Sequence, residues 1–572
     1  MSQESEVLEW KGHLARGKKY REKFYTEGDM LRFQNYFDNI FPLGTQRWDS
    51  KNDPEDRSFV PVNLAATIGR QMVRQVYYKN PRVIVVPRKV EFQAHARVLQ
   101  NITNAIIRKI MLKREMRMGI QDTYTLGTGI FKVGYDSEFG FSDEVLQSTE
   151  PLEGSATDQG KKGELIEYRS NVFSGMPWAL RAHPNDFVVP WDTRELTSAP
   201  WAVHWFVRPL ADVRADPKLN STGLEEDAEA TAIMAELDIG IDPAGIPGGT
   251  VKMVALAEIH DLREGRVRVL AKNHKRWLRD EEDVIATEIG HLPFHSLIFN
   301  PRSQHFWGTS DVHTIEPQLM ELNDIRTQDM KQRRISIAHL LYNKALIEEE
   351  ELEKLVSEDV GAAVAVDGNP GEVATFMQYH QGPDMITASN TVQGDIRAMV
   401  GFSRNQLGTG MGGRRTATEI GEISQAFDVG IGGRRDDVND VIIAIAEDIA
   451  QLIFAFWTEP RVASRVPGPG GNLFDVTYTG PQLRAKYDFQ IGAEDSRPVD
   501  STSRKKEAVE LINALKGIEG LDIGGMVKQI LGGAYEGIEF DQFQSQQQPQ
   551  AQSMEQFGQT VQGGAAGANA GL

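Results

Sequence analysis

Apolar residues recur with helical spacing through the first part of the chain. This spacing predicts helices over residues 6–36, 64–76 and 92–118. Short runs rich in β-branched residues, or runs that alternate apolar and polar residues, predict strands between and after them. These runs are "RVIVVP", the segment after the glycine turn of "YTLGTGIFKVGYD", "AHPNDFVVPWD", "PWAVHWFVRP" and a hairpin around "REGR".

The pattern changes in the middle of the chain, where one long helix is predicted from Thr309 to Leu341. At 1.5 Å per residue, its roughly 33 residues would span about 50 Å. Ser310 or Asp311 can cap this helix, and Pro317 falls within its early turns. Its apolar positions thin out into "RTQDMKQRRIS". The second half is therefore too polar for the core of a monomer.

The remaining pattern mixes helices and strands. A charged helix at 347–359 precedes two strands, "GAAVAVD" and "VATFMQY", and helices follow at 384–402 and 416–457. Three glycines in "VGIGGRR" each cost about 1 kcal/mol in a helix interior, so a kink is predicted there. The rest of the chain predicts strands at "FDVTYTG" and "KYDFQIGAED", helices at 503–515 and 526–531, and a disordered Gln- and Gly-rich tail from residue 541. The fold class is α+β.

Composition narrows the functional classes. The chain has 572 residues, enough for more than one packed unit, and no cysteine, which excludes disulfides, thiolate zinc sites and a cysteine nucleophile. It has no apolar run of membrane-spanning or signal-peptide length, so a soluble, intracellular protein is expected. The net charge of −19 argues against a tight grip on DNA through many phosphate contacts. It is compatible with a surface past which nucleic acid slides.

The stretch "NQLGTGMGGRRTATEI" carries two candidate nucleotide motifs. Gly408, Gly410 and Gly413 spell G-x-G-x-x-G, and the spacing also fits a P-loop with Arg414 in place of the lysine. Both motifs need a strand before the loop, whereas residues 384–402 have helical spacing. The pattern therefore favours a mobile loop between two helices, and a nucleotide site remains the alternative.

This loop is basic within an acidic protein. Arg404, Arg414 and Arg415 bring three positive charges with no acid between them, next to the polar Asn405 and Gln406. Such a loop suits intermittent contact with a polyanion.

Other candidate sites have weaker signals. His291 and His295 stand four residues apart, but Pro293 between them argues against one helical face and favours a structural role over metal binding. The acids Glu348–Glu351 point around a helix, as on a solvated or partner-binding face. The bases of "KQRR" fit either a solvated face or a helix that lines a nucleic-acid passage. Nothing in the sequence makes a positive case for an enzyme.

Taken in order, these segments resemble the portal proteins, or head-to-tail connectors, of tailed bacteriophages. The resemblance rests on several local patterns in the family's order rather than on one signature. The matching segments are "VPVNLAATIGRQMVRQVYYKNPRVIVVP", "DTYTLGTGIFKVGYD", "HPNDFVVPWDT", "WGTSDVHTIEPQLMELNDIRTQDMKQRR", "DMITASNTVQGDIRAMVGF", "RNQLGTGMGGRRTATEIGEISQAFDVGIGG" and "YDFQIGAEDSRPVDSTSRKKEAVELINAL".

The resemblance implies a portal fold with a defined domain order. The regions would be an α/β wing (1–307), a first stem helix (308–340), a small α/β clip (341–380), a second stem helix (381–402), a tunnel loop (403–415), a long kinked helix with the C-terminal wing part (416–500), a helical crown (501–540) and a disordered tail (541–572).

The resemblance also implies a function. The chain would form a ring, most often a dodecamer, at one capsid vertex of the virion, after assembly in the host bacterial cytoplasm with the major capsid protein and scaffold. Double-stranded DNA would pass through the ring, and the clip would dock the large terminase and then adaptor or tail proteins. No enzymatic activity, cofactor, metal or membrane partner is expected.

The resemblance assigns roles to two groups of residues. Those expected to contact DNA are Arg404, Asn405, Gln406, Arg414, Arg415, Lys331, Arg333 and Arg334. Those expected to dock the clip's partners are Glu348, Glu349, Glu350, Glu351 and Lys354.

Overall fold

The computed structural model mixes helices and sheets and divides into two compact units. Unit 1 comprises residues 1–30, 69–311 and 418–572, and unit 2 comprises residues 31–68 and 312–417. The residues described within these units are 3–43, 46–49, 59–77, 82–138, 169–231, 252–335, 339–342, 369, 374–377, 384–401, 417–467, 473–492 and 551–553.

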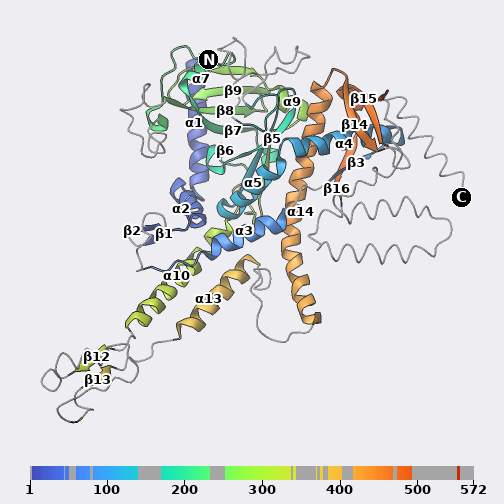
Figure 1. Ribbon diagram of the computed structural model, residues 1–572. Helices are drawn as coiled ribbons and strands as arrows, with labels where there is room; N and C mark the ends of the chain where they lie inside the picture. Colours follow the sequence, from blue (N-terminus) through green and yellow to red (C-terminus); the bar gives the residue numbers. More distant parts are fainter. Residues whose placement is uncertain are drawn as a thin grey trace, which may run out of the picture. The chain divides into compact units, whose positions relative to one another are not determined.

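The described helices and strands follow one another along the chain as coloured in Figure 1. The helices are α1 (Gln3–Glu22), α2 (Glu27–Phe37), α3 (Leu64–Val76), α4 (Gln93–Lys109), α5 (Leu112–Leu126), α7 (Leu210–Ala215), α9 (Val284–Ile289), α10 (Asp311–Ile335), α13 (Met385–Val400), α14 (Ala417–Phe456) and α15 (Gly480–Leu483), with 3-10 turns η1 (Val90–Phe92), η2 (Pro184–Asp186) and η3 (Leu196–Ser198). The strands are β1 (Ile40–Leu43), β2 (Gln46–Asp49), β3 (Val83–Pro87), β4 (Gly129–Tyr135), β5 (Pro177–Ala182), β6 (Phe187–Val188), β7 (Trp201–Pro209), β8 (Met253–Asp261), β9 (Arg266–Ala271), β10 (Arg279–Glu282), β11 (Phe294–Leu297), β12 (His339–Tyr342), β13 (Ala374–Met377), β14 (Arg461–Pro467), β15 (Leu473–Tyr478), β16 (Tyr487–Ile491) and β17 (Ala551–Ser553).

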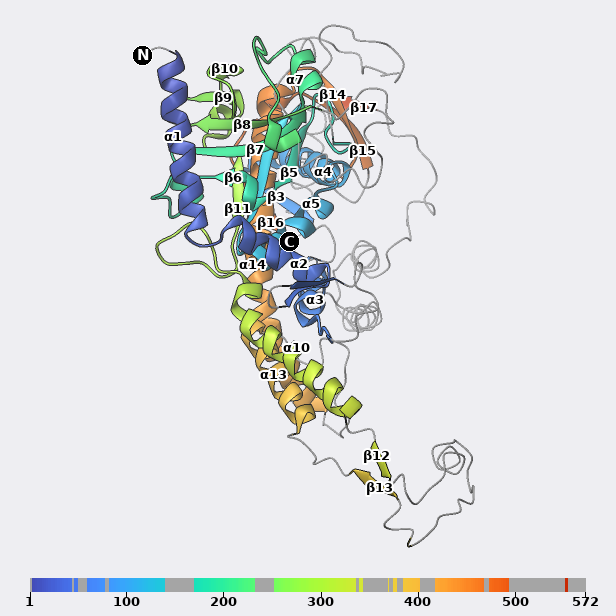
Figure 2. The same cartoon turned by 90° about the vertical axis from the view of Figure 1, so that its left-hand side faces the viewer.

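The largest sheet of unit 1 is antiparallel, with strand order β10-β9-β8-β7-β6. Helix α1 lies alongside this sheet (Figure 2) and buries Val7, Trp10 and Leu14 in one apolar cluster with Trp201 and Trp277. The strands at 187–188 and 201–209 and the hairpin around "REGR" are confirmed, with the hairpin formed by β8 and β9.

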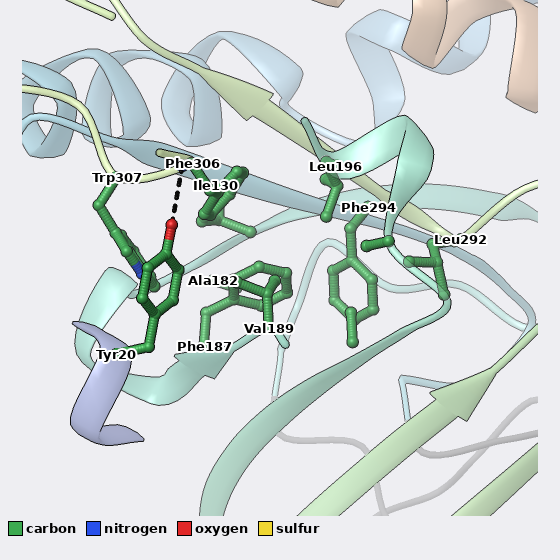
Figure 3. Close-up of a cluster of buried hydrophobic side chains, with 12 residues drawn as sticks. Tyr20, Ile130, Ala182, Phe187, Val189, Leu196, Leu292, Phe294, Phe306 and Trp307 are labelled. Atoms are coloured by element: carbon green, nitrogen blue, oxygen red, sulfur yellow. Dashed lines mark hydrogen bonds between the residues drawn. The ribbon is translucent and has the colours of Figure 1, made fainter. Parts of the chain in front are cut away.

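A second sheet of unit 1 has the order β11-β4-β5 and packs against a core of aromatic residues. Figure 3 shows the rings of Phe187 and Phe294 at the centre of this core, with Phe306 and Trp307 from the segment that leads to α10. The Tyr20 hydroxyl accepts a hydrogen bond from the Phe306 amide at 3.2 Å and donates one to the Thr193 carbonyl at 3.0 Å. This core therefore packs Phe306 and Trp307 against the sheet residues of unit 1.

Two predicted helices are each divided in the structure. The predicted 6–36 helix becomes α1 and α2, because Thr26 and Asp29 cap α2 reciprocally: each side chain accepts a hydrogen bond from the other's backbone amide. The predicted 92–118 helix becomes α4 and α5, since Met111 adopts a left-handed conformation with φ of 54° and Asn171 donates to the Ile110 carbonyl. Predictions of a single helix were wrong in both places.

Unit 2 contains most of α10, all of α13 and the β12–β13 pair between them in the chain. Helices α10 and α13 lie side by side in both views (Figures 1 and 2). Since the chain leaves α10 toward β12 and enters α13 after β13, the two helices run antiparallel. The prediction of a helix to Leu341 was wrong, because α10 ends at Ile335 and residues 339–342 pair with β13.

The long helix predicted at 416–457 is confirmed as α14, which runs unbroken through Gly430, Gly432 and Gly433. After it comes strand β14, which the sequence did not predict, and the predicted strands are confirmed as β15 and β16. Residues 551–553 pair in parallel with β15, which corrects the prediction of disorder for these three tail residues. The predicted helices at 347–359, 503–515 and 526–531, the strand at 361–367 and the rest of the tail lie outside the described residues.

Candidate nucleic-acid interface

Most residues predicted to contact DNA or partners lie outside the described part of the chain. These are Arg404, Asn405, Gln406, Arg414, Arg415, Glu348, Glu349, Glu350, Glu351 and Lys354. Lys331, Arg333 and Arg334 are described and stand together in the last turns of α10. The interface can therefore be built from α10 and α13.

The first half of α10 is a packed element of unit 2. Its buried residues recur at helical spacing: Val312, Ile315, Leu319, Leu322, Asn323 and Thr327. The segment of residues 59–63 runs along these buried residues. Side chains of α10 accept hydrogen bonds from its backbone amides. The Val62 amide donates to Asn323 Oδ1 at 2.7 Å, and the Val60 amide donates to Thr327 Oγ1 at 3.2 Å.

Helix α2 adds a charged contact to the same half of α10. Glu316 accepts hydrogen bonds from Arg32 Nε at 2.7 Å and from the Tyr36 hydroxyl at 2.6 Å. Burial, and after it this hydrogen bond to Glu316, raises the pKa of Tyr36 far above its usual value, so the phenol stays a proton donor. The position of α10 within unit 2 is thus set by residues 312–327.

Beyond Thr327, α10 is basic, and Gln328, Lys331 and Arg333 are exposed. Residues 326–335 carry four basic side chains, Arg326, Lys331, Arg333 and Arg334, against the single acid Asp329. Asp329 lies between two of them, 3.5 Å from Arg326 and 3.1 Å from Arg333. Lys331 is exposed and makes no hydrogen bond or ion pair with another described residue. The end of α10 therefore keeps a surplus of positive charge, which also suits the negative end of the helix dipole.

Helix α13 has one narrow buried stripe and an otherwise exposed surface with few charges. Its buried residues are Ser389, Val392, Ile396 and Val400. Asp384 caps its first turn, because its carboxylate accepts the amides of Ile386 and Thr387 at 3.1 Å each. Its exposed residues include Ile386 and Met399. A helix this narrowly buried offers most of its circumference for other contacts.

The glycine-rich segment 402–416 is flanked by helices on both sides. Helix α13 ends at Gly401, which adopts the left-handed conformation with φ of 75°, and α14 begins at Ala417. A phosphate-binding loop of either nucleotide class follows a strand. The element before this loop is a helix, as the spacing of residues 384–402 predicted.

Two glycine motifs that are far apart in the sequence meet at the start of α10. The turn at Gly127 packs directly on Gly308, and a Cβ added at Gly127 would lie 2.6 Å from the Gly308 carbonyl oxygen. The Gly308 amide donates to Thr128 Oγ1 at 3.0 Å, and the Ser310 hydroxyl donates to the Thr125 carbonyl at 2.6 Å. The start of α10 is therefore bonded directly to the α5–β4 turn.

A buried ion pair links the same point to α14. Arg434 contacts Asp311 Oδ1 at 3.0 Å, Asn300 Nδ2 donates to the same oxygen at 3.0 Å, and the Arg434 guanidinium lies 5.2 Å from the Phe299 ring. Burial raises the pKa of Asp311 although Arg434 opposes it. The sequence singled out Asp311 only as a possible cap and Arg434 only as a neighbour of glycines, because their pairing is long-range.

The histidines of "HLPFH" have a partner that the sequence did not reveal. Both His291 and His295 contact the carboxylate of Asp448 in α14, at 3.0 Å and 2.7 Å. Within the described ranges, no group of three His, Cys, Asp or Glu side chains is arranged to hold a metal ion. The two histidines therefore connect the segment around β11 to α14 within unit 1.

Comparison with models of known protein families and with curated proteins gives no match. Among the described helices, none is both long and apolar enough to cross a bilayer.

Proposed function

We propose that this chain is the portal protein of a tailed bacteriophage, a ring at one capsid vertex through which double-stranded DNA is packaged and ejected. The observation that carries the proposal is unit 2: two antiparallel helices, joined in the chain through a small β pair, each buried along only part of its surface. Helices exposed to this extent need other contacts, and copies of the same helices in a closed ring supply them.

The charge distribution supports a channel through which DNA passes rather than a site that binds DNA tightly. The chain carries a net charge of −19, while positive charge gathers at the end of α10 and in the loop at 404–415. In a ring, each such cluster repeats around the axis, so a few basic side chains per subunit act on the polyanion at many points. A wall of otherwise acidic or weakly charged surface lets DNA slide.

The proposal extends to the regions named by the resemblance. The wing, stem, clip, tunnel loop and crown follow one another in the order given above, with α10 as the first stem helix and β12 and β13 in the clip. The terminase, adaptor or tail, capsid protein and scaffold are the partners. In this role the chain performs no chemistry itself, and residues 348–351 and 354 meet a partner with a complementary charge.

The alternative is a nucleotide-dependent enzyme that uses 408–416 as a phosphate loop. The helix before that segment speaks against it, because both motifs require a strand there. Saturable ATP or NAD binding that is abolished by Gly413→Val would favour the enzyme.

Electron microscopy of the negatively stained purified protein, together with its native mass, tests the proposal. We expect closed rings of about twelve subunits with a central hole, as the family resemblance implies, held by repeated heterologous contacts. A chain that stays monomeric even when assembled with its capsid scaffold, and that binds ATP, would overturn it.

Within this function, we expect the triple variant Arg404→Ala, Arg414→Ala and Arg415→Ala to reduce DNA packaging or retention by about tenfold, because it removes three cationic contacts per subunit. DNA protected from nuclease inside assembled capsids measures the effect. Ring formation should be unchanged, and the matched triple lysine variant should behave nearly as wild type. Normal packaging and retention of full-length DNA by the alanine variant would show that these arginines have no contact role.

Reversal of the four charges Glu348–Glu351 to lysine should weaken docking of the terminase or adaptor by about tenfold or more, because like charges oppose at the interface. Binding of purified rings to either partner at two salt concentrations measures this. Glu225→Lys, at an exposed position of unit 1, serves as a control for the reversal of a surface charge outside residues 348–351. Equal affinity of the reversed and wild-type rings would place the docking surface elsewhere.

A further inference from the structure

A buried carboxylate of α14 accepts hydrogen bonds from two histidines that flank the start of β11. His291 Nε2 lies 3.0 Å from Asp448 Oδ1, and His295 Nε2 lies 2.7 Å from Asp448 Oδ2. The Asp448 side chain is only 4% exposed, between the fully buried Ile445 and Leu452, whereas the His291 side chain is 41% exposed. Asp448 is thus shielded from water, whereas His291 can exchange protons with the solvent.

The second ring nitrogen of His291 also faces an acceptor. Its Nδ1 lies 2.8 Å from the Leu292 carbonyl oxygen, which can only accept. A neutral imidazole has one N–H, so it can serve one of these two acceptors but not both. With Asp448 ionised, only the imidazolium form of His291 satisfies both contacts.

The electrostatics of the cluster agree with this assignment. Hydrogen bonding to Asp448 raises the pKa of His291 above its usual value, although partial burial opposes the shift. Burial alone would raise the pKa of Asp448, but the hydrogen bonds from His291 and His295 outweigh it and hold that pKa below its usual value. Asp448 is therefore a carboxylate at neutral pH.

Several other charged groups lie near the cluster, among them Arg88 and Asp488, which act electrostatically on Glu447. Glu447 precedes Asp448 in α14 and favours the charged form of His291. A cavity of about 740 Å³ borders His291 and His295, and its other charged or titratable lining residues are Arg194, Glu195, Arg302, His305 and Asp440. Arg302 is already hydrogen-bonded to Thr309 and Tyr25, so it does not replace His291 as the partner of Asp448.

We propose that His291, Asp448 and His295 form a pH-sensitive link between β11 and α14, closed while His291 is protonated and weakened when it loses its proton. On deprotonation, His291 keeps one N–H for two acceptors, and the buried Asp448 carboxylate loses the positive charge of His291 and keeps the contact with His295. The link belongs to unit 1 and does not depend on the proposed portal function.

The direction of the pH effect follows from the raised pKa of His291. A group whose pKa is higher in the folded than in the unfolded chain contributes fully below its unfolded value, about 6.5 for histidine. That contribution is lost as the pH rises through the folded value. Asp448 sets the acid limit, because its contribution is lost only as the pH falls below its usual range. The link is therefore strongest in mildly acidic solution and weakens above neutrality.

Hydrogen exchange measured by mass spectrometry at about pH 6 and pH 8.5, corrected for intrinsic exchange rates, tests the proposal on the full-length chain. We expect peptides covering 441–456 and 290–297 to open more at the higher pH. The opening equilibrium should change by up to tenfold for each pH unit by which the folded pKa of His291 exceeds the unfolded one.

Three variants make the test specific. His291→Gln still donates to Asp448 but carries no titratable group at position 291, so exchange in these peptides should depend on pH less than in wild type. His291→Arg keeps the positive charge and should hold the link closed at both pH values, which keeps the test valid if the glutamine variant folds poorly. His305→Gln, in the same cavity, should keep the wild-type pH dependence. An equal pH dependence in wild type and His291→Gln, or none in wild type, would overturn the proposal.

Discussion

Replacement of Gly308 by alanine should prevent stable folding of unit 1, at a cost of about 3 kcal/mol or more. A Cβ at this position would meet the Gly127 carbonyl oxygen and lie 2.6 Å from Ile298 Cγ2. The first of these atoms belongs to a backbone that is itself fixed, because Gly127 has φ of 80° and ends α5. Neither side of the contact can give way without moving the α5–β4 turn or the start of α10.

Soluble yield and denaturant-induced unfolding of the purified chain measure this effect. Gly432→Ala is the matched control, since Gly432 lies inside α14 and a Cβ there would have no atom within 4 Å. That change should stabilise the chain by about 0.5–1 kcal/mol, because alanine loses less backbone entropy in a helix. If Gly308→Ala unfolds at the wild-type denaturant concentration, the close approach of the two turns is not required.

The contact between Gly127 and Gly308 illustrates what the sequence could predict. The glycine turn after α5 and the start of the long helix near Ser310 both follow from local patterns of turn and capping residues. That the two motifs, some 180 residues apart, pack on each other does not follow from either pattern. Long-range pairing of this kind depends on how the β11-β4-β5 sheet closes, which short windows of sequence do not encode.

The two divided helices show the limit of hydrophobic periodicity. Apolar spacing continues across Met111, so the pattern alone predicts one helix over 92–118. The break arises because Asn171, distant in sequence, donates to the Ile110 carbonyl at the end of α4. The break before α2 was readable in principle, since "TEGD" at 26–29 has the spacing of a capping box.

The candidate interface was predicted in part. Composition and spacing predicted the polar end of α10 and a helix before the glycine-rich segment. The structure has α10 over Asp311–Ile335 and α13 over Met385–Val400. The pairing of Asp311 with Arg434 and of Asp448 with two histidines was missed, because each joins α14 to a distant segment. The sequence did contain one signal for these pairings. Charged residues interrupt the apolar pattern of α14, and charges that are buried need partners.

Removal of either member of the Lys132–Glu258 pair should destabilise unit 1 by about 3–5 kcal/mol. Lys132 belongs to β4 and Glu258 to β8, so their hydrogen-bonded ion pair joins the β11-β4-β5 sheet to the β10-β9-β8-β7-β6 sheet. Both side chains are at most 7% exposed. Lys132→Met leaves a buried carboxylate without its cation, and Glu258→Gln leaves a buried ammonium without its anion.

The pH dependence of the free energy of unfolding provides a second test of the Lys132–Glu258 ion pair. Burial alone would raise the pKa of Glu258, but Lys132, followed by His260, lowers it to about 2. A carboxyl group whose folded pKa is lowered contributes fully above its unfolded value, about 4.3, and loses that contribution as the pH falls toward 2. Wild type should therefore lose stability over this acid range, whereas Glu258→Gln should lose less.

A double-mutant cycle separates the pair from its surroundings, which include His260, 3.7 Å from Glu258, and the Trp178 ring, 5.8 Å from the Lys132 ammonium. The double variant Lys132→Met, Glu258→Gln removes both charges and should cost less than the sum of the two single variants by at least about 2 kcal/mol. Equal and additive losses would mean that each charge is satisfied independently. A strong coupling would instead mean that the two charges depend on each other and that their pair contributes to holding β4 against β8.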